Sequence, residues 1–348
     1  MQIFQKEKMF FAEHLSLMLK GGVSLSEALE ILRDESKSKS FRNVLDNVLE
    51  NILDGETLNK SLGNHPKVFD NFFQSVVRVG EKSGTLEENL KYLSVCLKKT
   101  YSLKRKIIGA LIYPFLVLIT GLVIVSLITI FILPRLFVLF GALQIELPLP
   151  TKILLGTGAF LKENIVIIFM GILFLFFIYK VLCSILSVRL FFGRIILSLP
   201  LFGAINKNHN LARFSRIFYT LFKAGMPLLD SLDICVETIP NQVYKKHIYA
   251  VREGVEKGEK ISENLKRFSE AFPVIFSQMV LVGEETGSLE ESMLYLANFY
   301  EQEVDSTLKD ISVILEPFLL ILVGIFVVFL ILAIITPIYQ FTSGFGVR

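Results

Sequence analysis

The chain alternates between stretches that mix polar and apolar residues and stretches that are almost purely apolar. Three apolar stretches are long, and Lys180 is the one charged side chain within them. A helix needs about 20 apolar residues to cross the hydrocarbon core of a bilayer. The pattern therefore predicts three transmembrane helices, near residues 107–134, 164–187 and 317–339.

The alternation occurs twice, because the chain contains one segment in two copies. A shift of 203 positions places Val79–Leu93 on Val282–Leu296, with nine identities in fifteen positions. The same shift places Phe11 on Phe214, and it does not change before the end of the apolar stretches. Each copy begins with a polar stretch and ends with an apolar one, so the copies are predicted to fold alike.

The polar part of each copy predicts short amphipathic helices. Apolar residues recur at helical spacing, as in Phe69, Phe72 and Phe73. In the first copy the expected helices cover residues 7–20, 25–36, 40–54, 57–62, 67–79 and 86–106. Such a pattern is typical of a compact helical bundle. The last helix of each bundle continues toward its apolar stretch without a glycine-rich linker, which would transmit tilt and rotation.

The direction of the copies predicts the topology. Two parallel copies that each end in a membrane span can share one compartment only if a further span lies between them. Lys and Arg cluster before the first span and after the second, which places both bundles in the cytoplasm. The predicted order is a cytoplasmic bundle (1–106), a span (107–134), an extracytoplasmic loop (135–163), a span (164–187), a cytoplasmic bundle (188–316), a span (317–339) and an extracytoplasmic tail (340–348).

Composition excludes several classes. The formal net charge is only +3, so a nucleic-acid interface is not expected. Charged residues near the N-terminus interrupt any secretory signal pattern. The three cysteines, Cys96, Cys183 and Cys235, are too far apart in sequence to suggest a disulfide framework, and they fit a reducing cytoplasm.

One motif recurs at the densest match. Gly80-Glu81-Lys82-Ser83-Gly84-Thr85-Leu86 reappears as Gly283-Glu284-Glu285-Thr286-Gly287-Ser288-Leu289. It reads as a joint between two helices, in which glycines supply positive φ angles and a hydroxyl caps the next helix. The alternative is a contact site for a partner on each bundle. The acids at the second position favour that alternative, because a turn has no obvious need for them.

No enzymatic site emerges from the sequence. The glycine and lysine spacing of the motif does not match a Walker loop. The four histidines, His14, His65, His209 and His247, lack the spacing of metal ligands. We therefore expect no catalytic residue, no cofactor and no metal.

A proline lies near the cytoplasmic end of two spans, in Tyr113-Pro114 and in Glu316-Pro317. These prolines are either tolerated in a membrane helix or form a flexible joint between bundle and span.

These features together resemble the inner-membrane platform proteins of type II secretion systems (protein F) and type IV pili (PilC). The resemblance rests on the duplicated bundle, the repeated glycine-acid motif and Tyr113-Pro114, and it covers the chain from about residue 10 onward. The second copy departs from the pattern, because Glu316 replaces the tyrosine. The early start of the first bundle is similar to the shorter competence-pilus branch.

The resemblance implies a multi-pass protein of the bacterial inner membrane without enzymatic activity. Its implied partners are a hexameric assembly ATPase, prepilins or pseudopilins, other inner-membrane assembly proteins and further copies of itself. A transporter or channel is the alternative, and so is a scaffold of unrelated machinery. The near absence of ionisable residues within the spans argues against transport of ions.

Overall fold

The computed structural model describes residues 2–132 and 202–344, together with a few positions between 149 and 178. The described residues form helices and connecting turns, without a strand, which confirms the all-α fold class. They divide into two compact units. The first contains residues 2–106 and 202–307, and the second contains the described residues from 107 to 178 and from 308 to 344.

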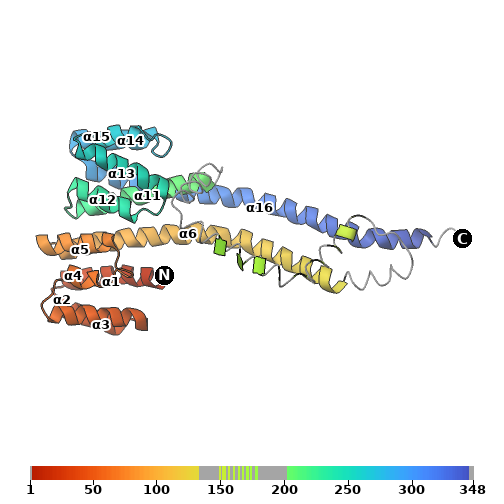
Figure 1. The fold of residues 1–348 in the computed structure, drawn as a ribbon, viewed down its shortest axis with the longest axis horizontal. Helices are drawn as coiled ribbons and strands as arrows, with labels where there is room; N and C mark the ends of the chain where they lie inside the picture. The colour runs from red at the N-terminus through yellow and green to blue at the C-terminus, as the bar shows by residue number, and fades with distance from the viewer. Residues whose placement is uncertain are drawn as a thin grey trace. The chain divides into compact units, whose positions relative to one another are not determined.

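The first unit holds two helical bundles (Figure 1). Bundle 1 is built from α1 (Gln2–Lys20), α2 (Leu25–Glu35), α3 (Lys39–Leu53), α4 (Leu58–Gly63), α5 (Asn71–Ser83) and the beginning of α6 (Leu86–Leu127). Bundle 2 is built from α11 (Phe202–Lys223), α12 (Leu228–Thr238), α13 (Gln242–Glu256), α14 (Ile261–Lys266), α15 (Val274–Thr286) and the beginning of α16 (Leu289–Gly344). From α12 to α15, each helix begins and ends 203 residues after its counterpart in bundle 1.

Side-chain caps explain where four helices of bundle 1 begin. An oxygen of the residue before each helix accepts a hydrogen bond from a backbone N–H three positions later, which satisfies an otherwise unpaired donor. These caps are Ser24, Ser38, Thr57 and Asp70. The Asp70 cap corrects the expected helix 67–79, because α5 begins only at Asn71 and continues to Ser83. Before it, Val68 and Phe69 donate to the carbonyl of His65 and form a turn.

Aromatic rings form the core of each bundle. Phe69 lies between Phe11 and Phe73, with ring centroids 5.4 and 4.9 Å away. In bundle 2 the equivalent rings are Phe214, Phe272 and Phe276, and all six side chains are buried. Buried aromatic pairs at these distances contribute about 0.5–1.5 kcal/mol beyond the area they bury. The duplicated apolar stripe therefore forms the same core twice.

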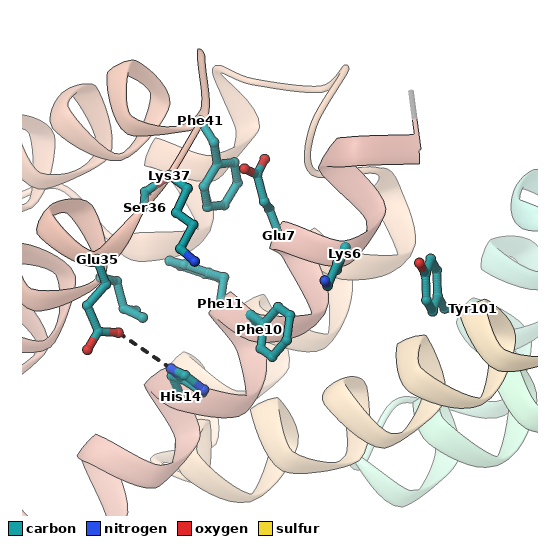
Figure 2. Close-up of a pocket in the computed structure, with 11 residues that line it drawn as sticks. Lys6, Glu7, Phe10, Phe11, His14, Glu35, Ser36, Lys37, Phe41 and Tyr101 are labelled. Atoms are coloured by element: carbon teal, nitrogen blue, oxygen red, sulfur yellow. Dashed lines mark ion pairs between the residues drawn. The ribbon is translucent and has the colours of Figure 1, made fainter. Parts of the chain in front are cut away.

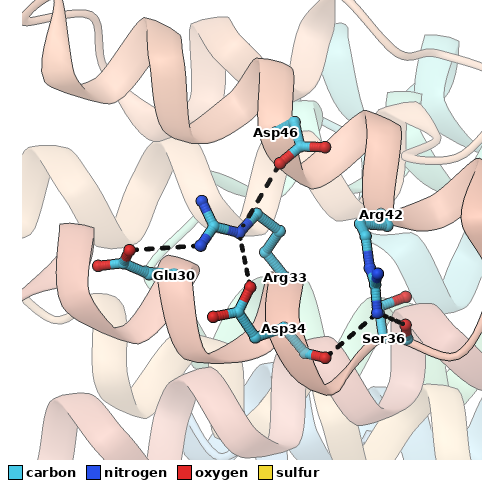
Figure 3. Close-up of polar contacts among 6 residues, drawn as sticks. All are labelled: Glu30, Arg33, Asp34, Ser36, Arg42 and Asp46. Atoms are coloured by element: carbon cyan, nitrogen blue, oxygen red, sulfur yellow. Dashed lines mark hydrogen bonds and ion pairs between the residues drawn. The ribbon is translucent and has the colours of Figure 1, made fainter.

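Polar contacts hold α2 against α3 at the edge of bundle 1 (Figure 3). The Arg33 guanidinium lies 2.9 Å from a carboxylate oxygen of Asp34 and 3.7 Å from one of Asp46 on α3. Arg42 donates to the carbonyl of Ser36 at 2.9 Å, in the connection between the helices. The Arg33 hydrogen bond lowers the pKa of the Asp34 carboxyl. These contacts fix the position of Asp34 on the surface.

Two helices are long and apolar enough to cross a membrane. They are α6 and the Leu289–Ala333 part of α16. Side chains such as Leu122 and Ile325 are 69% and 67% exposed, as expected for helices whose apolar surface is covered by lipid. Both helices continue through the expected boundaries at residues 106 and 316 without a break. A π-helical stretch, Ile128–Ile132, follows α6.

The predicted second span, 164–187, lies mostly outside the described residues, as do most of the predicted loop and the last residues of the tail. The described part of the second unit contains one small cluster, in which Leu330 and Ala333 are buried beside Ile128. The Thr151 hydroxyl donates to the carbonyl of Ala333 at 2.6 Å. The boundaries of the seven segments remain predictions.

Candidate functional site

In each bundle the repeated motif forms the joint between a short helix and the long helix that contains the apolar stretch. It joins α5 to α6 in bundle 1 and α15 to α16 in bundle 2. Gly84 follows the last residue of α5 with φ 74°, and Gly287 follows the last residue of α15 with φ 71°. A residue with a side chain rarely adopts this left-handed conformation, so glycine is favoured at both positions. In bundle 1, the N–H groups of Gly84 and Thr85 both donate to the carbonyl of Gly80.

Gly80 and Gly283 have a different role from the one expected in a turn, because both lie inside helices. A Cβ atom on Gly80 would lie 2.9 Å from the Cα of Leu86, and one on Gly283 would lie 2.9 Å from the Cα of Leu289. Real Cβ atoms do not come this close to a backbone carbon. Leu86 and Leu289 are the first residues of α6 and α16, so these glycines let each long helix pack directly against the helix before it.

Glu81 and Glu284 each cap a helix from a distance. The two Glu81 carboxylate oxygens accept hydrogen bonds from the backbone N–H groups of Leu58 and Asn59, at 2.5 and 2.9 Å. The Glu284 oxygens accept from Ile261 and Ser262 at 2.6 and 3.0 Å. These donors lie in the first turns of α4 and α14, where an acid also interacts favourably with the helix dipole.

This capping role is absent from the local sequence pattern, because acid and donors are 22 or 23 residues apart. One indication was available in bundle 2. Lys260 precedes α14 and provides no side-chain cap, so the first turn needs an acceptor from elsewhere. Glu81 and Glu284 therefore have a structural partner, while a contact with another protein stays a prediction.

The residues expected at the membrane entrance lie inside the long helices. Pro114 is half-buried within α6, and the neighbouring Tyr113 is exposed. Glu316 and Pro317 lie within α16 and are both exposed. A proline removes one backbone donor from a helix, yet α6 and α16 continue on both sides. Whether these positions act as joints remains a prediction.

The bundles also meet in an interface that the sequence pattern does not reveal. α5 of bundle 1 packs against α11 and α12 of bundle 2 (Figure 1). The Asn71 amide donates to Glu237 at 2.5 Å, and the Asn89 amide donates to the carbonyl of Ala224 at 3.3 Å. Cys96 is buried at this interface, and burial raises the pKa of its thiol to about 11. The two bundles therefore pack closely around this thiol.

A buried ion pair adjoins the interface. The Arg216 guanidinium contacts a carboxylate oxygen of Glu301 at 2.7 Å, and their side chains are 5% and 9% exposed. Arg216 also donates to the side chain of Asn298 at 2.7 Å. Lys99 of bundle 1 lies 3.3 Å from the second oxygen of Glu301. Lys106 and Asp305 form another ion pair between the bundles, at 2.5 Å.

The contacts described above join neighbouring helices and the two bundles. Within the described residues, no group of three His, Cys, Asp or Glu side chains is placed to hold a metal ion. The buried Lys8, Arg216 and Glu301 each take part in an ion pair, and the motif residues hold helices together. What the geometry provides is a pair of matching joints, each at the start of a long helix.

Comparison with known proteins extends the internal duplication to a family. The family model described as "Type II secretion system (T2SS), protein F" matches residues 11–134 and again residues 214–337. The type IV pilus assembly protein PilC of Pseudomonas aeruginosa is 31% identical over 337 residues, covering 97% of this chain and 90% of the relative. PilC of Thermus thermophilus is 29% identical, covering 99% and 84%. The type II secretion system protein F of Vibrio cholerae is 29% identical, covering 94% and 81%.

Replacing Gly80 or Gly283 by alanine is expected to destabilise the bundles. The added methyl group forces α5 from α6, or α15 from α16, at a cost of about 1–3 kcal/mol that the helix propensity of alanine, about 1 kcal/mol, only partly offsets. Gly63→Ala is the matched control, because a Cβ there meets only a side-chain oxygen at 3.7 Å. Thermal unfolding of the detergent-solubilised protein, followed by circular dichroism, measures the difference. Equal melting temperatures for Gly80→Ala and Gly63→Ala would contradict the close approach.

Removing a distant cap is expected to lower stability without a change in fold. Glu81→Ala or Glu284→Ala leaves two backbone donors without their charged acceptor, which costs about 1–3 kcal/mol. Glu50→Ala removes the same charge from an exposed position of α3 outside its first turn and should change stability by less than about 0.5 kcal/mol. The measurement is the same melting experiment. A Glu81→Ala protein as stable as Glu50→Ala would refute the capping role.

The buried ion pair gives a third prediction. Arg216→Met leaves the Glu301 carboxylate buried without its main partner, which costs about 3–5 kcal/mol. The double replacement Arg216→Met with Glu301→Leu removes both charges and should recover most of that loss. Chemical denaturation of the three proteins measures the difference. A double variant no more stable than Arg216→Met would show that Glu301 does not depend on this arginine.

Proposed function

The chain belongs to the type II secretion system protein F family, and we propose that it is the integral membrane platform on which a type IV pilus or a secretion pseudopilus is assembled. In this role it is not an enzyme. Both bundles lie in the cytoplasm and three spans cross the inner membrane. The family membership carries this proposal, and the relatives include proteins named for type IV pilus assembly and for type II secretion.

We propose that the protein couples a cytoplasmic assembly ATPase to prepilin or pseudopilin subunits in the membrane. The energy must come from a partner, because the sequence contains no Walker loop. The observation that supports coupling is the continuity of α6 and α16, which run from the helical joints into their apolar parts without a break. A continuous helix passes on rotation and tilt better than a flexible tether.

The repeated joints are the surface that we propose for contact with the assembly machinery. The tip of each joint is exposed, at Lys82 and Gly84 in bundle 1 and at Glu285 and Gly287 in bundle 2. Glu81 belongs to the same motif, although its carboxylate already holds the first turn of α4. A partner bound at the tip would act on the beginning of the long helix, where a small rotation is carried along its length.

Deletion of the gene, with complementation, tests the proposal. Loss of the protein should abolish pili, pseudopilus-dependent secretion or DNA uptake, and the wild-type gene should restore them. The purified protein should also retain an ATPase that carries a Walker loop. A clean deletion with normal pili, secretion and DNA uptake would overturn the platform role.

A second experiment separates the platform from the transporter or channel. The isolated protein in proteoliposomes should carry no solute flux above that of empty vesicles. Flux from this protein alone, together with normal pili in the deletion strain, would favour transport. Loss of pili without flux would favour the platform.

A further inference from the structure

The contact between the two bundles uses one surface of each. Surface A lies on α5 and α6 of bundle 1 and includes Val79, Tyr92 and Cys96. Surface B lies on α11 and on the turn that follows it in bundle 2, and includes Thr220 and Lys223 with their neighbours. Because the bundles are copies, bundle 2 has its own surface A on α15 and α16, and bundle 1 has its own surface B on α1. On α16 only Glu301 and Asp305 are in ion pairs with bundle 1 among the described residues. The equivalents of Val79, Tyr92 and Thr220 are exposed instead.

The second surface A is apolar and exposed. Ile275 is 47% exposed, whereas its counterpart Phe72 in bundle 1 is 3% exposed. Val282 and Tyr295, the counterparts of Val79 and Tyr92, are 50% and 49% exposed. A cluster of exposed large apolar side chains on the water-soluble part of a protein marks an interaction surface.

The second surface B is also uncovered. Leu17 on α1 is 62% exposed, whereas its counterpart Thr220 is 1% exposed beneath bundle 1. Thr220 lies beside the Cys96 thiol there, and its hydroxyl donates to the carbonyl of Arg216 at 2.8 Å. An exposed leucine stands where the duplicated position is buried in an interface. Leu17 is therefore an exposed apolar side chain that a partner could bury.

The chemistry of one contact is preserved in both halves. Within the chain, the Lys223 ammonium lies 5.8 Å from the centre of the Tyr92 ring, at a distance suited to a cation–π interaction. Lys20 occupies the position of Lys223, and Tyr295 occupies that of Tyr92. This lysine and this tyrosine lie on the two uncovered surfaces, one on each bundle.

The residues of a second contact, at the turn after α11, are also the same in both halves. A Cβ on Gly225 would lie 4.0 Å from a methyl carbon of Val79, an ordinary van der Waals distance, so the valine packs beside this turn. Gly22 and Val282 occupy the equivalent positions, and nothing lies within 4 Å of a Cβ built on Gly22. The space that Val79 fills beside Gly225 is thus open beside Gly22.

A cavity opens next to surface B in bundle 1. It has a volume of about 600 Å³ and is lined by residues of α1, of α2, α3 and their connection, and of α6 (Figure 2). Phe10 and Phe11 contribute rings to it, and His14 lies 3.7 Å from the Glu35 carboxylate at its edge. Glu35 follows Asp34, the counterpart of the Glu237 that binds Asn71. An equivalent contact would place the exposed Val274 at the rim of this cavity.

We propose that a second copy of this chain covers these surfaces. Surface A of bundle 2 in one copy packs on surface B of bundle 1 in the next, as surface A of bundle 1 packs on surface B of bundle 2 within one chain. The contact is head-to-tail, because the two uncovered surfaces differ and lie on different bundles. This inference does not depend on pilus assembly.

Charge makes the contact between copies weaker than the contact within a chain. In the contact between copies, Gln302 would stand in the place of Lys99, and Lys98 in the place of Glu301. No ion pair can form between these two residues. Likewise, Lys309 is equivalent to Lys106 and Ser102 is equivalent to Asp305, so this second ion pair is also absent from the contact between copies. Apolar and cation–π contacts remain, without the two ion pairs that join the bundles of one chain.

Cysteine cross-linking tests the proposal in membranes. In a Cys183→Ser background, Leu17→Cys is placed on one tagged chain and Phe299→Cys on a second chain with a different tag. These positions correspond to Thr220 and Cys96, which touch within the chain. We expect a thiol oxidant to yield a disulfide-linked dimer that carries both tags. Lys20→Cys with Tyr295→Cys, both at exposed positions, provides a second pair.

The internal contact supplies the matched control. Thr220→Cys should form a disulfide with the native Cys96 inside one chain, which shows that the fold and the oxidant are in order. Neither Leu17→Cys nor Phe299→Cys alone should give a dimer. If the control bond forms while both mixed pairs stay monomeric, the proposal is overturned. A dominant Leu17→Cys homodimer would also overturn it, because it requires a head-to-head contact.

Discussion

Each bundle depends on one close approach between two backbones. Gly80 lets α5 lie against the first residue of α6, and Gly283 does the same for α15 and α16. The next residue along, Glu81 or Glu284, uses its carboxylate to hold the first turn of a short helix in the same bundle. Two adjacent residues therefore tie the start of a long helix to the bundle.

The two copies share these devices and differ where they meet. The buried pair Arg216–Glu301 of bundle 2 has Glu13 and Lys98 at its equivalent positions, 3.5 Å apart with the signs exchanged. Lys99 can approach Glu301 but would be repelled by a lysine at that position. Charge thus favours the pairing within the chain over a pairing of two copies of bundle 1, which would set Lys99 beside Lys98.

Sequence patterns predict what is local and periodic. The duplication, the helical class and the left-handed Gly84 follow from spacing and from the limits that glycine removes. The start of α5 is missed by four residues because Asp70 caps the helix after a turn that also buries the apolar Phe69. The roles of Gly80 and Glu81 depend on neighbours brought close by folding, and so does the interface between the bundles. The spacing of apolar residues along one helix does not predict contacts between residues that are distant in sequence.

The proposed platform role requires that two equivalent bundles lie on the same side of the membrane and continue into apolar helices. Cysteines at Lys82 and Glu285, which are exposed and equivalent, test this directly in a background with Cys183→Ser. A membrane-impermeant thiol reagent should label neither in spheroplasts and both in inverted membrane vesicles. Labelling of one position from outside and the other from inside would place the bundles on opposite sides and contradict the account.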